Sequence, residues 1–222
     1  MNDFYRRYLP HWHPPEATYF ITFRLAGTLP REVIEQVERE LLAYRQQKNA
    51  QSSLEEERHR FRQYERWLEK SPHGPTWLEQ PAVAGVVRAE IHRLDQQRYT
   101  LLAYCIMPNH VHLLLDFAGY APAQEKETPP PRHRDFLNET LRLIKGRSAR
   151  FANQYLQRRG RFWQPESYDH VVRSPQSLLR IARYIAHNPV TAGLVRFWQH
   201  WPFTWVHPEL AEESGLLEEG SS

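Results

Sequence analysis

Two histidines separated by one residue are the first candidates for chemistry in this chain. His110 and His112 begin an apolar run, HVHLLLDF, whose composition is typical of a β-strand. Because strand side chains alternate between the two faces of a sheet, both imidazoles share one face and Val111 lies on the other. Two neutral imidazoles held close together can supply half of a divalent-metal site. Such pairs also occur as ordinary surface residues, so the pattern alone leaves both interpretations open.

A tyrosine and an asparagine four residues apart form the second candidate set. Tyr184 and Asn188 lie side by side on the helix predicted over Pro175–Asn188. A phenol can attack phosphorus, and a carboxamide oxygen beside two imidazoles favours Mg²⁺ or Mn²⁺ over structural zinc. From the spacing alone, a simpler interpretation is an amphipathic surface tyrosine and an asparagine that ends the helix before Pro189. The predicted polar face of this helix also holds Ser177, Arg180 and His187, opposite the apolar stripe Leu178, Ile181, Ala182 and Ile185.

The strands and helices that position these residues are predicted from hydrophobic periodicity and from the Gly and Pro residues that mark turns. The predicted strands are Thr18–Leu25, Tyr99–Met107, His110–Phe117 and Ser167–Arg173. The predicted helices lie at 31–70, 81–95, 136–156 and 175–188, the last capped by Ser174. This order predicts an α+β fold, a ferredoxin-like β-α-β-β-α-β core with an antiparallel sheet, extra inserted helices and a C-terminal helix that carries Tyr184.

We interpret residues 1–222 as a single domain. Within it, 31–95 is an inserted helical region, 118–134 a flexible proline-rich loop, and 201–222 a C-terminal tail. On the helix Phe136–Leu156 we expect an apolar face made by Leu137, Leu141, Ile144, Phe151, Ala152 and Tyr155.

The charge balance is nearly even, yet one segment is strongly basic. The chain has 29 Lys and Arg against 26 Asp and Glu, while Leu141–Tyr184 holds nine arginines, Lys145 and only two acids. Such a surface suits phosphates, and arginine suits them bidentately. Solvated helix faces and core aromatic residues explain the same pattern equally well. The candidates for DNA contact are Arg142, Lys145, Arg150, Arg158, Arg161, Trp163, Arg180 and His187.

Composition also excludes several classes of protein. The single cysteine, Cys105, excludes an internal disulfide framework and a cysteine-based zinc site, and its apolar surroundings indicate a buried thiol. No apolar stretch is long enough to span a bilayer, and the N-terminus lacks a signal-peptide core. We therefore expect a cytoplasmic protein. His11 and His13 form another spaced pair, but prolines follow and no strand surrounds them, so we do not assign them to metal.

Three ordered motifs and the N-terminal strand resemble a known family. Residues 107–115, MPNHVHLLL, resemble the MPNHVH signature of HUH-type tyrosine transposases, and residues 184–195, YIAHNPVTAGLV, resemble their YIxxNPVxAGLV segment. Between them, Arg161–Gln164 and Tyr168–His170 resemble the intervening block. The start of the chain, from Arg6 through Arg24, matches the REP-associated branch. The resemblance covers most of residues 5–200 and is to REP-associated tyrosine transposases.

The resemblance implies a function and a site. His110 and His112 would be metal ligands, Asn188 the third protein ligand, and Tyr184 the nucleophile, with Mg²⁺ or Mn²⁺ as cofactor. Many insertion-sequence relatives carry glutamine where this chain has Asn188. The implied activity is metal-dependent cleavage and transesterification of single-stranded, hairpin-forming repeat DNA through a 5′-phosphotyrosine. The implied setting is a bacterial, nucleoid-associated protein with no membrane partner, acting as a monomer or a homodimer.

Competing assignments remain at this stage. Tyr168, beside Asp169 and near His170, is the rival nucleophile, and we favour Tyr184 because its partner lies one helical turn away. A domesticated, non-catalytic nucleic-acid-binding protein is the main alternative function. A hydrolase that activates water would tolerate Tyr184→Phe and leave no covalent adduct. Replication initiators and relaxases share the two-histidine chemistry, but their helicase domains or tyrosine pairs are not evident here.

Overall fold

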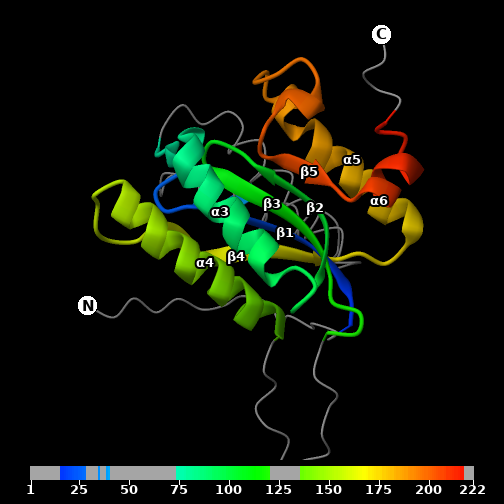
Figure 1. Ribbon diagram of the computed structural model, residues 1–222, viewed down its shortest axis with the longest axis horizontal. Coiled ribbons are helices and arrows are strands. Elements are labelled where there is room, and N and C mark those ends of the chain that lie inside the picture. Colours follow the sequence, from blue (N-terminus) through cyan, green and yellow to red (C-terminus); the bar gives the residue numbers. More distant parts are fainter. Residues whose placement is uncertain (1–15, 29–34, 36–38, 41–73, 121–135, 218–222) are drawn as a thin grey trace, which may run out of the picture.

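The computed structural model describes residues 16–28, 35, 39–40, 74–120 and 136–217, and these build a five-stranded antiparallel sheet covered by helices on both faces (Figure 1). The strand order is β4-β1-β3-β2-β5. The strands are β1 (Thr18–Leu25), β2 (Thr100–Ile106), β3 (His110–Asp116), β4 (Trp163–Val171) and β5 (Thr204–Val206). Without β5 this is the predicted ferredoxin-like arrangement.

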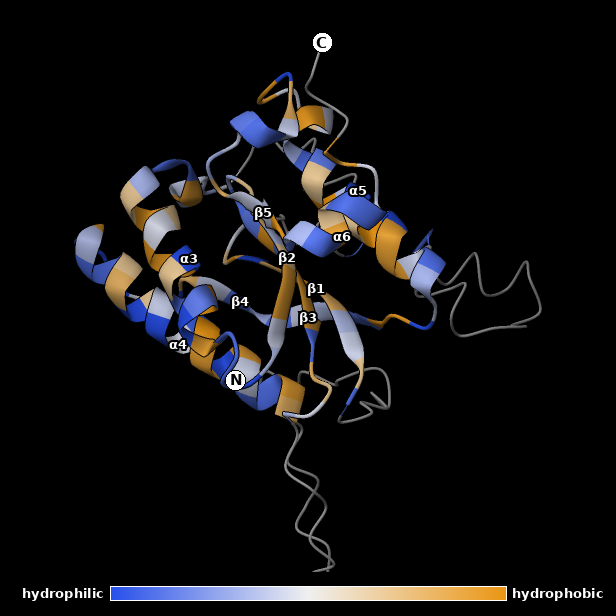
Figure 2. Cartoon of the chain, turned by 45° about the vertical axis from the view of Figure 1, so that its right-hand side comes forward, coloured by the Kyte–Doolittle hydropathy of each residue, from blue (hydrophilic) through white to orange (hydrophobic). Residues whose placement is uncertain are grey.

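One face of the sheet packs against α3 (Pro81–Leu94) and α4 (Phe136–Tyr155). The apolar run of β1 supplies alternate residues to this side, among them Ile21 and Phe23, and β3 supplies Val111 and Leu113. From the helices, Ile91 and Ile144 are fully buried against them. Figure 2 shows α3 and α4 on one side of the sheet, with α5 and α6 on the other.

The opposite face packs against α5 (Pro175–Thr191) and α6 (Pro208–Glu213). Here Phe20 and Leu114 meet the apolar stripe of α5, in which Ile181 and Ile185 are buried. Ser174 caps the helix as predicted, its hydroxyl accepting a hydrogen bond from the Ser177 amide at 3.2 Å. The two histidines of β3 point to this second face because they alternate with Val111.

The end of α5 differs from the prediction, because the helix continues through Pro189 to Thr191 instead of ending at Asn188. Proline lacks an N–H donor and its ring crowds the preceding turn, but its carbonyl still accepts a hydrogen bond, here from the Leu194 amide at 2.9 Å. The Gly193 amide bonds to the Val190 carbonyl at 2.9 Å, and Gly193 has a φ of 71°. These two bonds form a Schellman motif, which ends the helix one turn later than the proline suggested.

Two boundaries within the predicted domain also need correction. The region 31–95 was assigned to an insertion, but α3 at its end is the first helix of the core. The tail assigned to 201–222 contains β5, which pairs with β2, and α6, whose Leu210 is buried under α5. A short helix, η1 (Trp77–Glu79), precedes α3, and another, η2 (Trp198–His200), lies between α5 and β5. Only tertiary pairing makes the three-residue β5 a strand, so no local pattern announced it.

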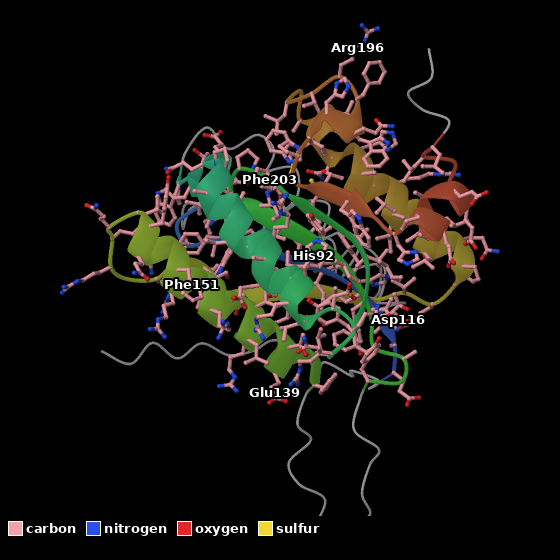
Figure 3. The ribbon with its side chains drawn as sticks, in the orientation of Figure 1. His92, Asp116, Glu139, Phe151, Arg196 and Phe203 are labelled. Atoms are coloured by element: carbon pink, nitrogen blue, oxygen red, sulfur yellow. The ribbon has the colours of Figure 1, made fainter. Side chains whose placement is uncertain are left out.

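The apolar face expected for α4 is correct for most of its length. Leu137, Leu141, Ile144 and Ala152 are buried, but Phe151 and Tyr155 are 40% and 56% exposed. Phe151 lies on the outer part of α4 (Figure 3), with the Arg147 guanidinium 5.8 Å from its ring. The helical spacing of apolar residues continues to the end of α4, but the sheet does not extend under the last turns of the helix, so Phe151 and Tyr155 stay exposed.

Some predictions fall on segments outside the described residues: the helices at 31–70 except for three positions, most of the loop 118–134, and His11 and His13. The extent of a single domain over 1–222 likewise stays a prediction. Among the helices that the structure describes, none combines the length and the apolar character needed to cross a membrane.

Candidate metal and tyrosine site

The histidine pair lies buried at the centre of the sheet, on the face that α5 covers. His110 is 1% exposed and His112 is fully buried. Across the five strands, His112 belongs to one row of directly paired residues: Tyr168, Thr22, His112, Cys105 and Thr204. The antiparallel register therefore places Thr22 of β1 directly beside His112 and Tyr168 of β4 one strand further along the row, as the sequence spacing could not show.

The two imidazoles point their Nε2 atoms at each other and hold their Nδ1 atoms in hydrogen bonds. The Nε2 atoms are 3.0 Å apart. The Nδ1 atom of His112 lies 2.8 Å from the Thr22 hydroxyl, and that of His110 lies 2.6 Å from the Asn109 side-chain oxygen. Outer partners of this kind orient the rings of histidines that bind metals.

Burial keeps both imidazoles neutral. It lowers the pKa of His110 from its ordinary value of 6.5 to about 3. Burial also lowers the pKa of His112 well below 6.5, and the neighbouring His110 lowers it further. Neutral imidazole is the form that binds a metal through a ring nitrogen, so the site presents two nitrogen donors at neutral pH.

Tyr184 reaches this pair from α5. Its ring packs edge-to-face on His112, with centroids 5.4 Å apart, and on Phe20 of β1 at 5.9 Å. Its hydroxyl oxygen is buried. The prediction that Tyr184 and Asn188 lie on the polar face of the helix is therefore correct only in part. Tyr184 points toward the sheet and Asn188 is buried, because α5 lies over a face that is itself polar at His110 and His112.

Asn188 follows one turn after Tyr184 and is 1% exposed. Among the described residues, neither its Oδ1 nor its Nδ2 atom has a hydrogen-bond partner. A buried amide without partners costs about 1–3 kcal/mol, so such a group is expected to serve a ligand.

The donor set fits a hard divalent cation that keeps oxygen ligands besides the two imidazoles. The two Nε2 atoms face each other 3.0 Å apart, so one ion could be held by both imidazoles. No group of three or more His, Cys, Asp or Glu side chains gathers anywhere in the described part of the chain. A metal at this pair would thus rely on the Asn188 oxygen and on oxygen atoms from substrate or water.

No family model matches the chain. A curated protein of Haemophilus influenzae, named "Putative REP-associated tyrosine transposase", is 25% identical over 125 residues. The predicted resemblance to REP-associated tyrosine transposases is confirmed. The match covers 52% of this chain, which spans 63% of the length of that relative. A solved structure described as a REP-associated tyrosine transposase bound to a REP hairpin is 18% identical, with a TM-score of 0.49 over 96% of this chain and 87% of that one.

The basic residues predicted to contact DNA do not form one surface. Arg142 and Arg150 are exposed on α4, whereas Arg180 is exposed on α5, on the other side of the sheet. His187, also on α5, is partly buried and donates from Nδ1 to the Arg183 carbonyl at 2.9 Å. Only the α5 residues share a face with Tyr184.

Of the other predicted DNA contacts, Trp163, Arg158 and Lys145 have structural roles. Trp163 is 5% exposed, and its indole donates to Ser148 at 3.0 Å, so it is a core residue and cannot stack on a base. Arg158 stacks 3.7 Å over the Trp77 ring and donates to the Arg161 carbonyl. The side chain of Arg161 itself is exposed.

Lys145 binds α4 to β4 through the Pro165 carbonyl at 3.0 Å and the Ser167 hydroxyl at 3.1 Å. Burial and the nearby Arg24 lower the pKa of Lys145 to about 8, partly opposed by Glu166. Its ammonium is thus occupied within the protein and lies near Phe23, on the α4 side of the sheet.

Sequence reasoning missed Thr22 and Asn109, which are 6% and 7% exposed and hold the two histidines. A signal for Thr22 was present, since it is a hydroxyl residue inside the apolar strand TYFITFRL. Tyr168, the rival nucleophile, pairs directly with Thr22 and packs 6.3 Å from Phe20. It therefore also lies on the site's face of the sheet. Cys105 is buried as predicted, and burial raises the pKa of its thiol to about 12.

Proposed function

We propose that this protein is a metal-dependent single-strand DNA endonuclease and strand transferase that acts on hairpin-forming repeat DNA through Tyr184. The observation that carries the proposal is the packing of the Tyr184 ring on His112, beside a buried pair of neutral imidazoles. The unpartnered amide of Asn188, one turn along the same helix, supports a ligand role. The name of the curated relative supports both the reaction class and repeat-associated DNA as substrate.

Each protein group would have one task. A bound Mg²⁺ or Mn²⁺ would withdraw electron density from a phosphate oxygen and so favour attack at phosphorus. His110, His112 and Asn188 would hold that ion. The Tyr184 oxygen would form a bond to phosphorus while the bond to the 3′ oxygen breaks. The phenol proton leaves to solvent, and the departing oxygen takes up a proton to become a 3′-hydroxyl.

The product of this step is a 5′-phosphotyrosine, which retains the energy of the phosphodiester bond. A 3′-hydroxyl can therefore attack the phosphotyrosine and rejoin a strand without any nucleotide cofactor. The edge-to-face packing of Tyr184 on His112 and on Phe20 would restrict the directions from which the phenol can approach the phosphate.

The test is a denaturing-gel assay with labelled single-stranded hairpin DNA and Mn²⁺, comparing the wild type with Tyr184→Phe and Tyr168→Phe. We expect a covalent protein–DNA band in the wild type and in Tyr168→Phe but not in Tyr184→Phe. Tyr168 is the matched control because it lies on the same face and contacts the same Phe20 ring.

Other outcomes would contradict parts of the proposal. A band lost only in Tyr168→Phe would move the nucleophile to β4 and keep the reaction class. Cleavage without a band, retained in Tyr184→Phe, would indicate hydrolysis by activated water. Hairpin binding with neither cleavage nor adduct would indicate a non-catalytic binding protein.

A further inference from the structure

We infer that Asn109 and Thr22 are positioning residues that set which ring nitrogen of each histidine carries the proton. In this assignment Asn109 holds His110 in one tautomer, while Thr22 lets His112 change tautomer when a cation binds. The inference rests on the proposed function, because it assigns the histidine pair to a divalent cation.

Asn109 determines the proton position on His110. Its side-chain oxygen, 2.6 Å from the Nδ1 atom, can only accept a hydrogen bond. His110 must therefore donate from Nδ1, and a neutral imidazole carries one proton. The Nε2 atom of His110 is left with a lone pair directed at His112.

Without a cation, one proton must lie between the two Nε2 atoms, because two facing lone pairs 3.0 Å apart repel each other. Since His110 keeps its proton on Nδ1, this shared proton belongs to Nε2 of His112. The Nδ1 atom of His112 then has a lone pair, and the Thr22 hydroxyl donates to it at 2.8 Å. Every ring nitrogen of the pair is satisfied in this state.

When a cation takes both Nε2 lone pairs, the proton of His112 must move from Nε2 to Nδ1. The exchange goes through solvent and leaves the number of protons unchanged. Thr22 can follow it, because a hydroxyl both donates and accepts. By rotating, it changes from donor to acceptor and keeps its hydrogen bond to Nδ1.

Both positioning residues are buried. His112 is fully buried, and Thr22, directly opposite it on β1, is 6% exposed. Asn109 is held in turn by its backbone carbonyl, which accepts from the Leu25 amide at 2.9 Å. Loss of such an outer partner typically weakens metal binding by about 10- to 100-fold.

The first test reads the tautomers directly from long-range ¹H–¹⁵N correlation spectra of the full chain. In metal-free protein we expect His110 to be protonated on Nδ1 and His112 on Nε2. With saturating Mg²⁺, His112 should be protonated on Nδ1 while His110 stays unchanged. The assignment of Asn109 would be overturned by His110 protonated on Nε2, and that of Thr22 by a His112 tautomer that Mg²⁺ does not alter.

The second test measures Mn²⁺ affinity by electron paramagnetic resonance, without DNA. Thr22→Val, which keeps the shape but removes the hydroxyl, should bind about 10- to 100-fold more weakly, and Asn109→Ala should lose a similar factor. Thr22→Ser and Asn109→Asp, which retain the required oxygen, should bind close to wild type. Unchanged affinity in Thr22→Val would overturn the role of Thr22.

The matched control is Thr18→Val, which removes another side-chain hydrogen bond between β1 and β3, from Thr18 to Asp116 at 3.1 Å. It should leave Mn²⁺ affinity unchanged, and a loss equal to that of Thr22→Val would indicate a general effect of strand pairing. Wild-type protein that binds no divalent cation would contradict the proposed function instead. The metal-free spectra would still test the tautomer of His110.

Discussion

The two faces of the sheet differ in whether their buried polar groups have hydrogen-bond partners. On the side of α3 and α4, the Tyr99 hydroxyl donates to the Ile91 carbonyl at 2.6 Å, and the buried Glu90 carboxylate pairs with Arg93 and Arg147. On the side of α5, two residues with buried polar atoms, Asn188 and Trp198, lack hydrogen-bond partners among the described residues. The pair His110 and His112 lies on this second side.

This difference indicates that the two faces serve different ends. A satisfied, apolar face lowers the free energy of the folded state, whereas unpartnered buried groups raise it. Folded chains keep such costly groups mainly where a ligand or a reaction requires them. The α3 and α4 side therefore maintains the fold, and the α5 side carries the candidate site at a cost in stability.

The largest expected effect comes from removing a histidine of the pair. His110→Ala or His112→Ala should lower Mn²⁺-dependent cleavage of hairpin DNA by about 10³-fold or more, because a direct ligand matters more than its outer partners. Single-turnover cleavage assays would measure it. His92→Ala is the matched control, since His92 is an exposed histidine of α3 on the other face (Figure 3). Equal losses of cleavage in all three variants would contradict the assignment of the reaction to the α5 face.

Next in size is a substitution in the apolar face. Ile144→Ala should lower the free energy of unfolding by about 3 kcal/mol, because Ile144 is fully buried and its truncation leaves a cavity. Urea denaturation would measure this value. Well below the melting temperature, the folded variant should cleave hairpin DNA at close to the wild-type rate. A large loss of cleavage in fully folded protein would show that the two faces are coupled.

A substitution at Asn188 should have the opposite effects: higher stability and lower activity. Asn188→Leu removes a buried amide whose atoms lack partners, so the free energy of unfolding should rise by about 1–3 kcal/mol. Mn²⁺ affinity and cleavage should fall in the same variant. Urea denaturation together with metal titration would separate the two effects. A destabilised variant that keeps its metal affinity would assign Asn188 to the fold.

The last prediction concerns pH. In the folded protein the pKa values of both buried histidines lie below 6.5, and that of His110 is about 3. As the pH falls, the histidines of the unfolded chain are therefore protonated before those of the folded protein. The neutral histidines therefore contribute fully to the free energy of unfolding above about pH 6.5. This contribution is lost as the pH falls toward 3, by up to about 1.4 kcal/mol per pH unit for each proton. Urea denaturation of metal-free protein would show a shallower slope in the double variant His110→Gln, His112→Gln. An unchanged slope would contradict the burial of the pair.

Much of this molecule was predictable from local patterns. The aromatic and β-branched residues of TYFITFRL and the apolar run HVHLLLDF predicted β1 and β3, and the alternation of strand side chains placed His110 and His112 on one face. The ferredoxin-like order followed from the sequence of elements. These features depend on residues that are close together in the sequence, so the periodicity of the sequence is enough to predict them.

Other features depend on contacts between distant segments, and for these the sequence predictions were wrong or silent. For Trp163 the sequence left open a DNA contact and a place in the core, and the structure buries it, with its indole donating to Ser148 of α4. β5 exists only because it pairs with β2.

By itself, the sequence determined the strands β1 to β4, the helices α3 to α5, the shared face of the two histidines and the one-turn spacing of Tyr184 and Asn188. The tertiary structure decided that α5 turns Tyr184 onto His112, and that Thr22 of β1 meets the same imidazole across the sheet. Side-chain spacing within an element follows from backbone geometry, which is local. Which side chains meet across elements follows from strand register and helix packing, which bring together residues about 70 to 90 positions apart in the chain.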